Sequence, residues 1–353
     1  MNVLDLFSGC GGISLGFKLA GFNISGGVDI DPDSIKTFQK NFPKSKAICE
    51  SLLEYSDEKI IEDFGGEEID IVVGGPPCQG FSSANRWQKE NEDPRNKLFF
   101  EYLRFVELLK PKAVVIENVR GILTRDNGFA KSRIEKLLKD LGYNVDCEVL
   151  NASDYGVPQN RLRAFFVAIR NDYKETFDFE QLNQKPKVTV KEAIGELYDL
   201  DKNPKDKLTN KPQNKYLKYL RKENQEIFNH ETKYPAKLTQ ERISHVPQGG
   251  NWANIPTELF PNNRSNRHSS AFKRLDEQAC SVTIDTGNAH SNYFHPLYNR
   301  IPTVREAARI QSFKDDFILE GSRTSQYRQI GNAVPPLLAK EVAIELKKYL
   351  DKK

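Results

Sequence analysis

The segment VLDLFSGCGG at residues 3–12 decides the fold that we expect for this chain. Its first half, from Val3 to Phe7, is a short and mostly apolar run, which is typical of a buried strand. Its second half is a glycine-rich turn, and the helical pattern that follows at residues 13–20 ends at Gly21. A strand that passes through a glycine turn into a helix begins a βαβ unit, so this segment predicts an α/β fold.

Outward from this segment, short apolar runs alternate with helical patterns along the first 170 residues. Such alternation is typical of a doubly wound, mostly parallel sheet. We predict a second strand that ends at Ile30 and further strands over residues 69–73, 113–116, 143–150 and 164–169. Helices are predicted over residues 32–42, 98–109 and 134–141.

After Arg170 the sequence loses this regularity, and residues 171–299 are rich in Lys, Asn, Gln, Pro and Tyr. Helices are predicted here and beyond over residues 190–197, 215–228, 304–311 and 337–350. We therefore divide the chain into a first domain at residues 1–172, a smaller irregular domain with its hinge at 173–325, and a C-terminal segment at 326–353.

The composition limits the class of protein. A chain of 353 residues with 38% hydrophobic residues is long enough for about two domains with a large core. It has no run of about 18 apolar residues, so we expect neither a membrane span nor a targeting segment. The five cysteines are widely spaced and form no C-x-x-C pair. They argue against a disulfide framework and against a zinc site, and they favour a reducing, cytoplasmic setting.

Charge and histidine are unevenly distributed along the chain. Residues 201–274 hold 15 Lys and Arg against 7 Asp and Glu, although the net charge of the whole chain is only +3. A basic segment on an acidic body indicates a polyanionic partner, and a solvated Lys-rich surface is the alternative. All five histidines lie after residue 229, so the chemistry of the first half uses neither imidazole bases nor histidine-bound metal.

The glycine turn predicts a cofactor site. It resembles a dinucleotide fingerprint, although Ser14 replaces the third glycine and no basic residue follows to hold a phosphate. Asp29 lies 20 residues after Gly9 at the end of the second predicted strand, where a carboxylate accepts hydrogen bonds from ribose hydroxyls. Together these residues predict an adenosine-type cofactor, with NAD and S-adenosylmethionine both open.

Three polar segments follow apolar strands and predict a reactive site. In GGPPCQGFS, residues 74–82, two prolines fix Cys78 at a strand exit, which favours a nucleophile over an inert buried thiol. Glu117, in ENV, ends the next strand and is expected to project into the same crevice. The segment QNRLR at residues 159–163 places two guanidiniums on one side of an extended chain, where they are predicted to stabilise an oxyanion.

With these segments the chain resembles the DNA (cytosine-5) methyltransferases of the bacterial restriction-modification type, over nearly its whole length. The resemblance implies the S-adenosylmethionine-dependent methyltransferase fold, a doubly wound and mostly parallel sheet, with a smaller irregular target-recognition domain at residues 173–325. The motifs occur in the family's order: DLFSGCGG (5–12), VDIDP (28–32), GGPPCQGFS (74–82), DPRNKLF (93–99), ENV (117–119), QNRLR (159–163), TVREAARIQSF (303–313) and QIGNAVPP (329–336).

The resemblance also assigns roles to single residues. Cys78 is similar to the thiol that attacks carbon 6 of cytosine, and Glu117 to the group that engages ring nitrogen 3. Arg163 resembles the residue that stabilises the thiol and the base carbonyl, with Arg161 in support. The positions that resemble cofactor contacts are Phe7, Ser8, Gly9, Gly11, Gly12, Asp29, Ile30, Glu50, Pro76, Leu98 and Asn332. Because Asn332 would have to reach the first sheet, the resemblance also implies that residues 326–353 return to the first domain. Those expected to contact DNA are Gln79, Ser82, Arg86, Arg95, Arg264, Arg267 and Thr283.

The implied reaction is methyl transfer from S-adenosylmethionine to carbon 5 of a cytosine flipped out of duplex DNA, with residues 79–97 as the lid. The resemblance implies a monomer whose partner is duplex DNA. A cognate restriction endonuclease would act on the same DNA site without binding this chain. The alternatives are a tRNA cytosine methyltransferase, a catalytically silent DNA-binding protein on the same scaffold, and a nicotinamide-dependent oxidoreductase, which only the glycine turn favours.

Overall fold

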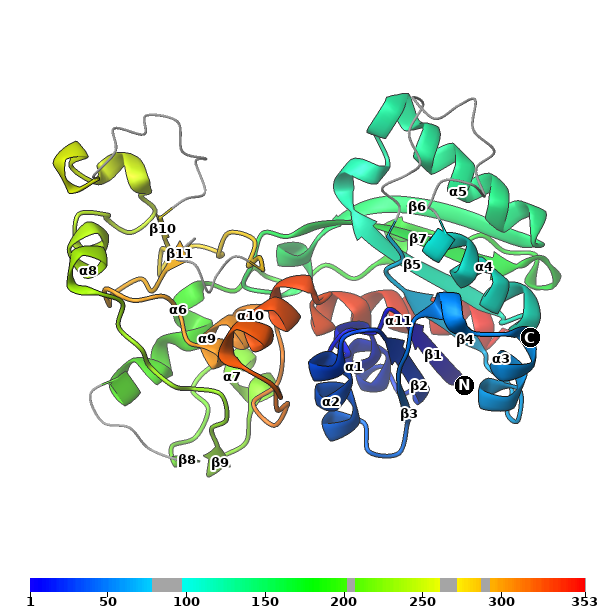
Figure 1. Ribbon diagram of the computed structural model, residues 1–353, viewed down its shortest axis with the longest axis horizontal. Coiled ribbons are helices and arrows are strands. Elements are labelled where there is room, and N and C mark those ends of the chain that lie inside the picture. Colours follow the sequence, from blue (N-terminus) through cyan, green and yellow to red (C-terminus); the bar gives the residue numbers. More distant parts are fainter. Residues whose placement is uncertain (78–96, 202–206, 261–271, 287–292, 353) are drawn as a thin grey trace. The chain divides into compact units, whose positions relative to one another are not determined.

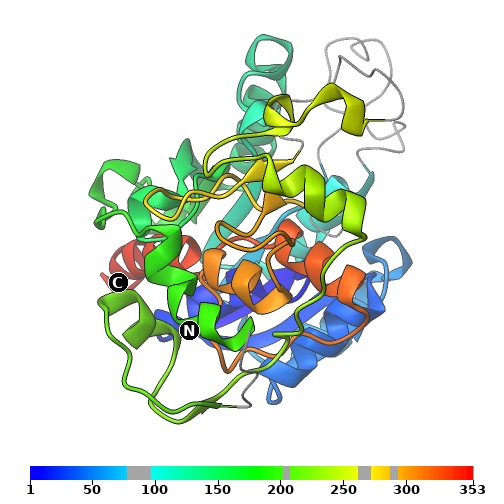
Figure 2. The same cartoon turned by 90° about the vertical axis from the view of Figure 1, so that its left-hand side faces the viewer.

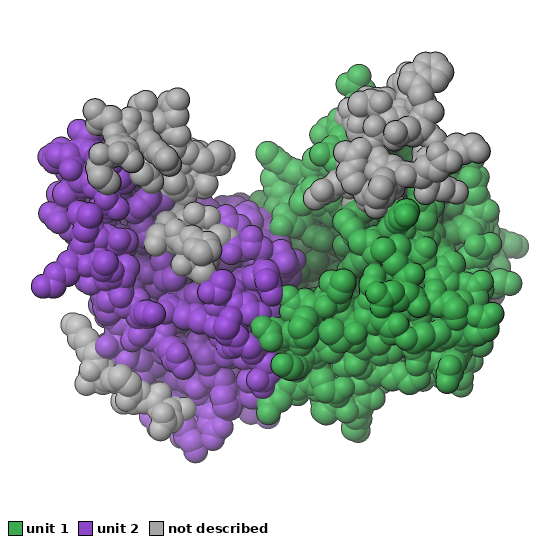
Figure 3. Space-filling model, viewed as in Figure 1, with its two compact units in different colours: residues 1–155, 162–184, 334–353 green, residues 156–161, 185–333 purple. Residues whose placement is uncertain are grey.

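The computed structural model describes residues 1–77, 97–201, 207–260, 272–286 and 293–352. By its internal contacts the chain divides into two compact units, coloured green and purple in Figure 3. Unit 1 comprises residues 1–155, 162–184 and 334–353, and unit 2 comprises residues 156–161 and 185–333. The structure therefore divides after residues 155, 161, 184 and 333. The sequence analysis places the boundaries after residues 172 and 325.

Unit 1 is built on a seven-stranded sheet with the strand order β3-β2-β1-β4-β5-β7-β6 (Figure 1). The strands from β3 to β5 are parallel, and β7 runs antiparallel to both of its neighbours. The strand order reverses between β1 and β4, where sheets of this kind bind ligands at their carboxyl edge. The strands are β1 (Asn2–Leu6), β2 (Asn23–Asp29), β3 (Lys46–Cys49), β4 (Ile71–Gly74), β5 (Ala113–Val119), β6 (Tyr143–Asn151) and β7 (Leu162–Arg170).

Helices cover both faces of this sheet. Successive residues of a strand point to opposite faces, and the strands carry buried apolar residues on both, so each face needs a layer of helices. On one face, Leu4 and its neighbours join residues of α4 and α5 in a large apolar core. On the other face, Ser14 of α1 bonds to Asp5, and α1 packs so closely on α11 that a Cβ on Gly16 would come within 2.5 Å of the Ala339 Cβ. The helices are α1 (Gly12–Leu19), α2 (Pro32–Asn41), α3 (Asp57–Phe64), α4 (Lys97–Leu109), α5 (Phe129–Asp140) and α11 (Pro336–Leu350).

The doubly wound, mostly parallel sheet predicted from the sequence is confirmed. Each strand and helix predicted in the first 170 residues is found, although α5 begins at Phe129 rather than at residue 134. The sequence pattern misses β3 and α3. β3 is four residues long and only partly buried, and α3 buries just Ile60 and Phe64, so neither produces a clear apolar period.

Unit 2 has short elements and small sheets. Its two sheets are pairs of two-residue strands, β8 (Lys207–Leu208) with β9 (Gln225–Glu226) and β10 (Lys273–Arg274) with β11 (Tyr293–Phe294). α9 packs against both α6 and α10 (Figures 1 and 2). The helices are α6 (Val190–Ile194), α7 (Lys215–Leu220), α8 (Lys237–Ser244), α9 (Val304–Ile310) and α10 (Arg323–Asn332).

Two helices predicted in this unit differ from the observed ones. The helix predicted over residues 215–228 is wrong beyond Leu220, because Arg221 adopts an extended backbone and its side chain donates to Glu196 at 2.8 Å. The helix predicted over residues 190–197 is α6 followed by a 3₁₀ helix, Gly195–Asp201. The pattern misses α8 and α10, which are largely polar.

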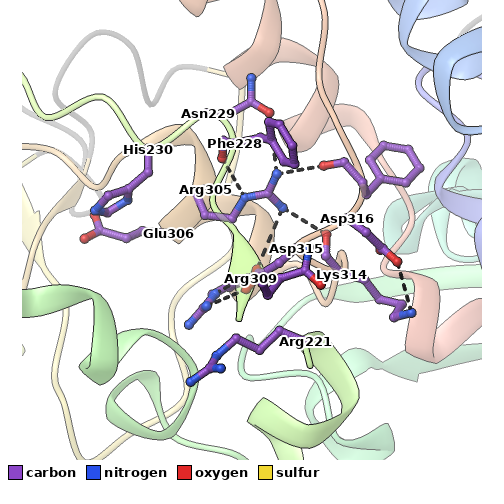
Figure 4. A network of polar contacts seen from close by, with 12 residues as sticks. Arg221, Phe228, Asn229, His230, Arg305, Glu306, Arg309, Lys314, Asp315 and Asp316 are labelled. Carbon is purple, nitrogen blue, oxygen red and sulfur yellow. Dashed lines mark hydrogen bonds and ion pairs between the residues drawn. The ribbon is translucent and has the colours of Figure 1, made fainter. Parts of the chain in front are cut away.

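A network of buried arginines runs through unit 2, and Figure 4 shows part of it. Arg300 donates from Nε to Asp201 at 2.8 Å and from its two terminal nitrogens to Glu306 at 2.8 and 2.9 Å. Burial opposes ionisation of Glu306, but the charge of the Arg300 guanidinium and its hydrogen bonds outweigh burial and hold the pKa of Glu306 well below its ordinary value. This part of the network is therefore a charged pair inside the protein.

Helix α9, which carries Glu306, also carries Arg309, and Arg309 extends the network to a second ion pair. Arg309 contacts Asp315 at 2.9 Å and Glu196 at 2.8 Å, and Glu196 also accepts from Arg221. Arg305, one turn earlier, points its guanidinium at main-chain carbonyl groups (Figure 4). The segment TVREAARIQSF, which the sequence analysis notes as a motif, thus forms the charged centre of unit 2.

Candidate active site

The glycine turn between β1 and α1 needs its glycines. Phe7, Gly9 and Gly11 have positive φ angles of 61°, 52° and 95°. At Gly11 a Cβ would also lie 2.5 Å from the ring of Phe42, so a larger residue would be strained and would collide. A Cβ on Gly9 would meet nothing within 4 Å, which means that the turn is open at this residue.

Asp29 joins the end of β2 to this turn. Its Oδ2 accepts from the Gly9 amide at 2.8 Å and its Oδ1 from the Asp31 amide at 2.9 Å. Burial is the main cause that raises the pKa of Asp29 above its ordinary value. The structure therefore brings together the turn and the carboxylate that the sequence predicts for a cofactor site.

Two further predicted cofactor residues lie at the ends of β2 and β3. Ile30 follows Asp29 and is 72% exposed, so it presents an apolar surface at the carboxyl edge of the sheet. Glu50 follows β3, its amide donates to the Asp29 carbonyl, and its carboxylate accepts from Lys59 Nζ at 2.5 Å. This ion pair fixes the carboxylate of Glu50, and Lys59 is a residue that the sequence analysis does not identify.

Glu117 and Arg163 form an ion pair at the end of β5. Arg163 Nε lies 2.9 Å from Glu117 Oε1, and both side chains are largely buried. The pair exists because β7 is antiparallel to β5, which returns Arg163 to the place where Glu117 leaves the sheet. A carboxylate and a guanidinium are thus held together at the carboxyl edge of the parallel strands.

The chain between β4 and residue 78 lies against this pair. A Cβ on Gly75 would be 3.3 Å from Glu117 Oε2, so the glycine leaves room for the carboxylate. The Asn118 side chain donates to the carbonyl of Pro76 at 2.9 Å and fixes the chain two residues before Cys78. Pro76 is buried and Leu98, in the first turn of α4, is partly buried.

Several predicted site residues lie outside the described part of the chain. They are the nucleophile Cys78, the DNA contacts Gln79, Ser82, Arg86 and Arg95, and the DNA contacts Arg264 and Arg267. Most of the predicted lid, residues 79–97, lies there too.

The remaining predicted residues belong to unit 2. Arg161 is fully buried, and its terminal nitrogens donate to the carbonyls of Ile284 and Gly331 at 3.0 and 2.9 Å. Arg161 and Arg163, only two residues apart, therefore have different partners in different units. The hydroxyl of Thr283 donates to the Asn160 carbonyl at 2.8 Å, and Asn332, the last residue of α10, is exposed.

The family model of the C-5 cytosine-specific DNA methylases matches residues 1–348. This chain belongs to that family. The methylase is 37% identical over 344 residues to Type II methyltransferase M1.HphI of Haemophilus parahaemolyticus, covering 97% of this chain and 86% of the relative. It is 36% identical over 382 residues to Type II methyltransferase M.DdeI of Desulfomicrobium norvegicum, covering 99% of this chain and 89% of that relative.

Solved structures agree with the fold of the methylase. A crystal structure of an E. coli prophage protein described as a DNA modification methyltransferase is similar over 100% of both chains, with a TM-score of 0.79 and 29% identity. The Dnmt2 methyltransferase of S. pombe has the same fold, with a TM-score of 0.58 and 17% identity over 99% of this chain and 98% of that one. The prediction of a DNA (cytosine-5) methyltransferase is confirmed. Across the described residues, no helix has both the length and the apolar character to cross a membrane.

A polar pair that was not predicted from the sequence joins β1, before the glycine turn, to α1, after it. Asp5 is 1% exposed, and its Oδ2 accepts from Ser14 Oγ at 2.6 Å. Asp5 Oδ1 and Ser8 Oγ are buried without a hydrogen-bond partner in the described part of the chain. The available signal was the single carboxylate within the apolar strand segment VLDLF, since a buried polar group needs a partner.

Proposed function

We propose that this methylase transfers the methyl group of S-adenosylmethionine to carbon 5 of a cytosine in a specific sequence of duplex DNA, as part of a restriction-modification system. The observation that carries the proposal is the Glu117–Arg163 pair at the end of β5, next to the chain that leads to Cys78. The names of the relatives, Type II methyltransferases, support the restriction-modification role.

Carbon 5 of cytosine is a weak nucleophile, so the ring must be activated before it can accept a methyl group. The thiolate of Cys78 adds to carbon 6, and the electron pair moves toward carbon 5, ring nitrogen 3 and the carbonyl. In the proposed reaction Glu117 hydrogen-bonds nitrogen 3, and Arg163 stabilises the carbonyl oxygen. After carbon 5 takes the methyl group, it loses its proton to a base, the carbon–sulfur bond breaks, and Cys78 leaves as a thiolate.

The residues around the glycine turn fit the cofactor. Gly9 is open, Asp29 lies beside it for the ribose hydroxyls, and Ile30 offers an exposed apolar side chain to a purine ring. The buried Ser8 hydroxyl has no hydrogen-bond partner in the described residues, as expected for a group that meets a ligand. When bound, S-adenosylmethionine supplies an electrophilic methyl group on a sulfonium. Because the chain belongs to a methyltransferase family, S-adenosylmethionine is favoured over NAD as the cofactor.

The target cytosine must leave the duplex, because carbons 5 and 6 are inaccessible within the stacked bases. We assign recognition of the DNA to the irregular middle of the chain, whose basic segment at residues 201–274 suits a phosphate backbone. The enzyme is proposed to act as a cytoplasmic monomer, with any cognate endonuclease acting separately. The proposed DNA contacts are Gln79, Ser82, Arg86 and Arg95 near the flipped base, and Arg264, Arg267 and Thr283 for the sequence.

The test has two steps. Bisulfite sequencing of genomic DNA from cells that express the protein identifies the modified cytosine and its sequence. A duplex with 5-fluorocytosine at that position is then incubated with the enzyme and S-adenosylmethionine. Because fluorine cannot leave as the proton does, the enzyme is expected to stay covalently attached to the DNA and to migrate as a larger species under denaturing conditions.

Matched variants connect this result to the proposed roles. Cys78→Ala is expected to abolish both methylation and trapping, whereas Cys280→Ser, which changes a thiol that contacts the Val188 carbonyl in unit 2, should retain both. Glu117→Gln is expected to reduce the rate of trapping strongly. Trapping by Cys78→Ala, or methylation of tRNA but not of duplex DNA, would contradict the proposal.

A further inference from the structure

Asp5 is a buried carboxyl group in the middle of a parallel sheet. It lies on β1 between Leu4 and Leu6, which are fully buried. One of its oxygens accepts from Ser14 Oγ at 2.6 Å, and the other has no hydrogen-bond partner in the described residues. Burying a carboxylate without a countercharge is costly, so its presence here requires an explanation.

Among the described residues, the groups that share a hydrogen bond or an electrostatic interaction with Asp5 supply no positive charge. They are the Ser14 hydroxyl of α1, Asp29 of β2, Cys10 of the glycine turn and Tyr102 of α4. β4, the other neighbouring strand, consists of Ile71–Gly74 and carries no ionisable side chain. Asp29 is itself a carboxylate, so its charge repels a charge on Asp5.

The surroundings make Asp5 able to change its charge near neutral pH. Burial raises the pKa of Asp5 to about 7, the Ser14 hydrogen bond opposes this, and the charge of Asp29 adds to it. Burial raises the pKa of Cys10 to about 12, so this thiol stays neutral. The Tyr102 hydroxyl is occupied by the carbonyls of Val72 and Val115.

The charges of Asp5 and of residues at the glycine turn act on one another: Asp29 raises the pKa of Asp5, and Asp5 raises the pKa of Cys10. A charge bound at that turn would therefore act on Asp5 as well. We propose that the Asp5–Ser14 pair is a charge-sensing positioning element that favours the sulfonium donor S-adenosylmethionine over its neutral thioether product, S-adenosylhomocysteine. The positive donor draws Asp5 into its carboxylate form, and the proton passes to solvent. Once the methyl group and its positive charge have left the sulfur, Asp5 takes a proton back from solvent and the product is held less tightly. This inference rests on the proposed function.

The sign of the pH dependence follows from this linkage. Below about pH 7 Asp5 is protonated in the free enzyme, so binding of the donor must release a proton, and affinity rises with pH. The limit for one linked proton is about tenfold in affinity per pH unit. Above about pH 7 the carboxylate already exists, and the affinity for the donor should level off. S-adenosylhomocysteine should show a much flatter profile.

The test is isothermal titration calorimetry of the full chain without DNA, so that no methyl transfer occurs. S-adenosylmethionine and S-adenosylhomocysteine are each titrated from about pH 6 to pH 8, in pairs of buffers with different ionisation enthalpies. The ratio of the two dissociation constants and the number of protons released are measured. We expect the preference for the donor to rise by about tenfold over this range, with proton release for the donor at the acid end only.

Variants separate charge sensing from a merely structural role. Asp5→Asn should flatten the ratio across the pH range and abolish proton release. Ser14→Ala removes the bond that lowers the pKa of Asp5, so the midpoint of the profile should move to higher pH, and Ser14→Thr should restore it. Ser25→Ala changes another buried serine, on β2, and should leave the profile unchanged.

The possible outcomes distinguish the charge-sensing role of Asp5 from the proposed methyltransferase function. A wild-type ratio that does not change with pH, or the same profile in Asp5→Asn, would overturn the charge-sensing role while leaving the methyltransferase reaction intact. If the folded protein bound neither ligand at any pH, the proposed use of S-adenosylmethionine would fail, and this inference with it.

Discussion

Unit 1 and unit 2 fill their interiors with different chemistry. In unit 1 a large core of aliphatic and aromatic residues lies between the sheet and α3, α4 and α5. In unit 2 buried apolar residues such as Phe294 and Phe313 share the interior with charged groups, since the largest fully buried side chains include Arg300, Arg305 and Arg309. A parallel sheet with helices on both faces can satisfy its own main chain, whereas short elements joined by long loops leave carbonyl groups for arginines to bind.

This difference has a consequence for sensitivity to mutation. Apolar contacts are non-directional and tolerate small changes of shape, so a conservative change in unit 1 costs little. A buried ion pair loses its countercharge when one partner is removed, so a single change in unit 2 costs much more. Four predictions test this contrast.

The largest effect is expected for Arg309→Met. The change leaves Asp315 without its close partner and removes one of the two arginines at Glu196. Loss of a partner from a buried pair costs about 3–5 kcal/mol, so unit 2 should unfold at lower urea than unit 1. Hydrogen exchange resolved by peptide, measured across a urea series, reports each unit separately.

The matched control for this variant is Arg309→Met combined with Asp315→Leu, which removes both charges of the Arg309–Asp315 pair. Part of the lost stability should return, because an apolar pair of similar volume often replaces a buried ion pair. Equal loss in the single and double variants would mean that packing, and not the uncompensated charge, causes the destabilisation.

Acid should weaken unit 2 through Glu306. Its pKa is depressed in the folded protein, so the stability that the Glu306 pair contributes is present above the unfolded value of about 4.3. That stability is lost as the pH falls from this value through the folded pKa. Hydrogen exchange of α9 should therefore accelerate more steeply on acidification than exchange of β4 and β5, and Glu306→Gln should reduce this difference. Identical acid profiles for α9 and the sheet would contradict the expectation.

A smaller effect is expected for Ile134→Val in α5. Ile134 is fully buried in the apolar core of unit 1, and the change removes one methylene group. The cost should be about 0.5–1.5 kcal/mol and should not depend on salt or pH, because no charge is involved. Urea unfolding at two pH values and two salt concentrations measures this. A strong pH dependence would show that the core of unit 1 is coupled to a titrating group.

The smallest effect is expected for Lys136→Met. Lys136 pairs with Asp140 at 2.7 Å on the exposed side of α5, so water and salt screen the attraction. The loss should be at most about 0.5 kcal/mol and should vanish at high salt. This variant is the surface counterpart of Arg309→Met. A cost close to that of Arg309→Met would remove burial as the reason for the contrast.

The candidate site was predictable to the extent that its parts are local. The glycine turn, Asp29 and Glu117 each end or follow an apolar strand, and this arrangement can be read from a few neighbouring residues. The partners of other polar residues near the site, Glu50 and Asp5, were not predictable. Lys59 at Glu50 and Ser14 at Asp5 depend on how helices pack on the sheet, which no local pattern records.

The sequence by itself determined the order of strands and helices in the first 170 residues, the ordered motifs of the family, and the basic character of residues 201–274. These follow from local periodicity and residue type. Only the tertiary structure decided that Arg163 pairs with Glu117 while Arg161 binds carbonyl groups in unit 2, and that Asp5 is buried against the Ser14 hydroxyl. The reason is physical: a polar side chain takes its partner from whichever distant segment the fold brings within hydrogen-bond reach, and spacing along the chain does not encode that choice.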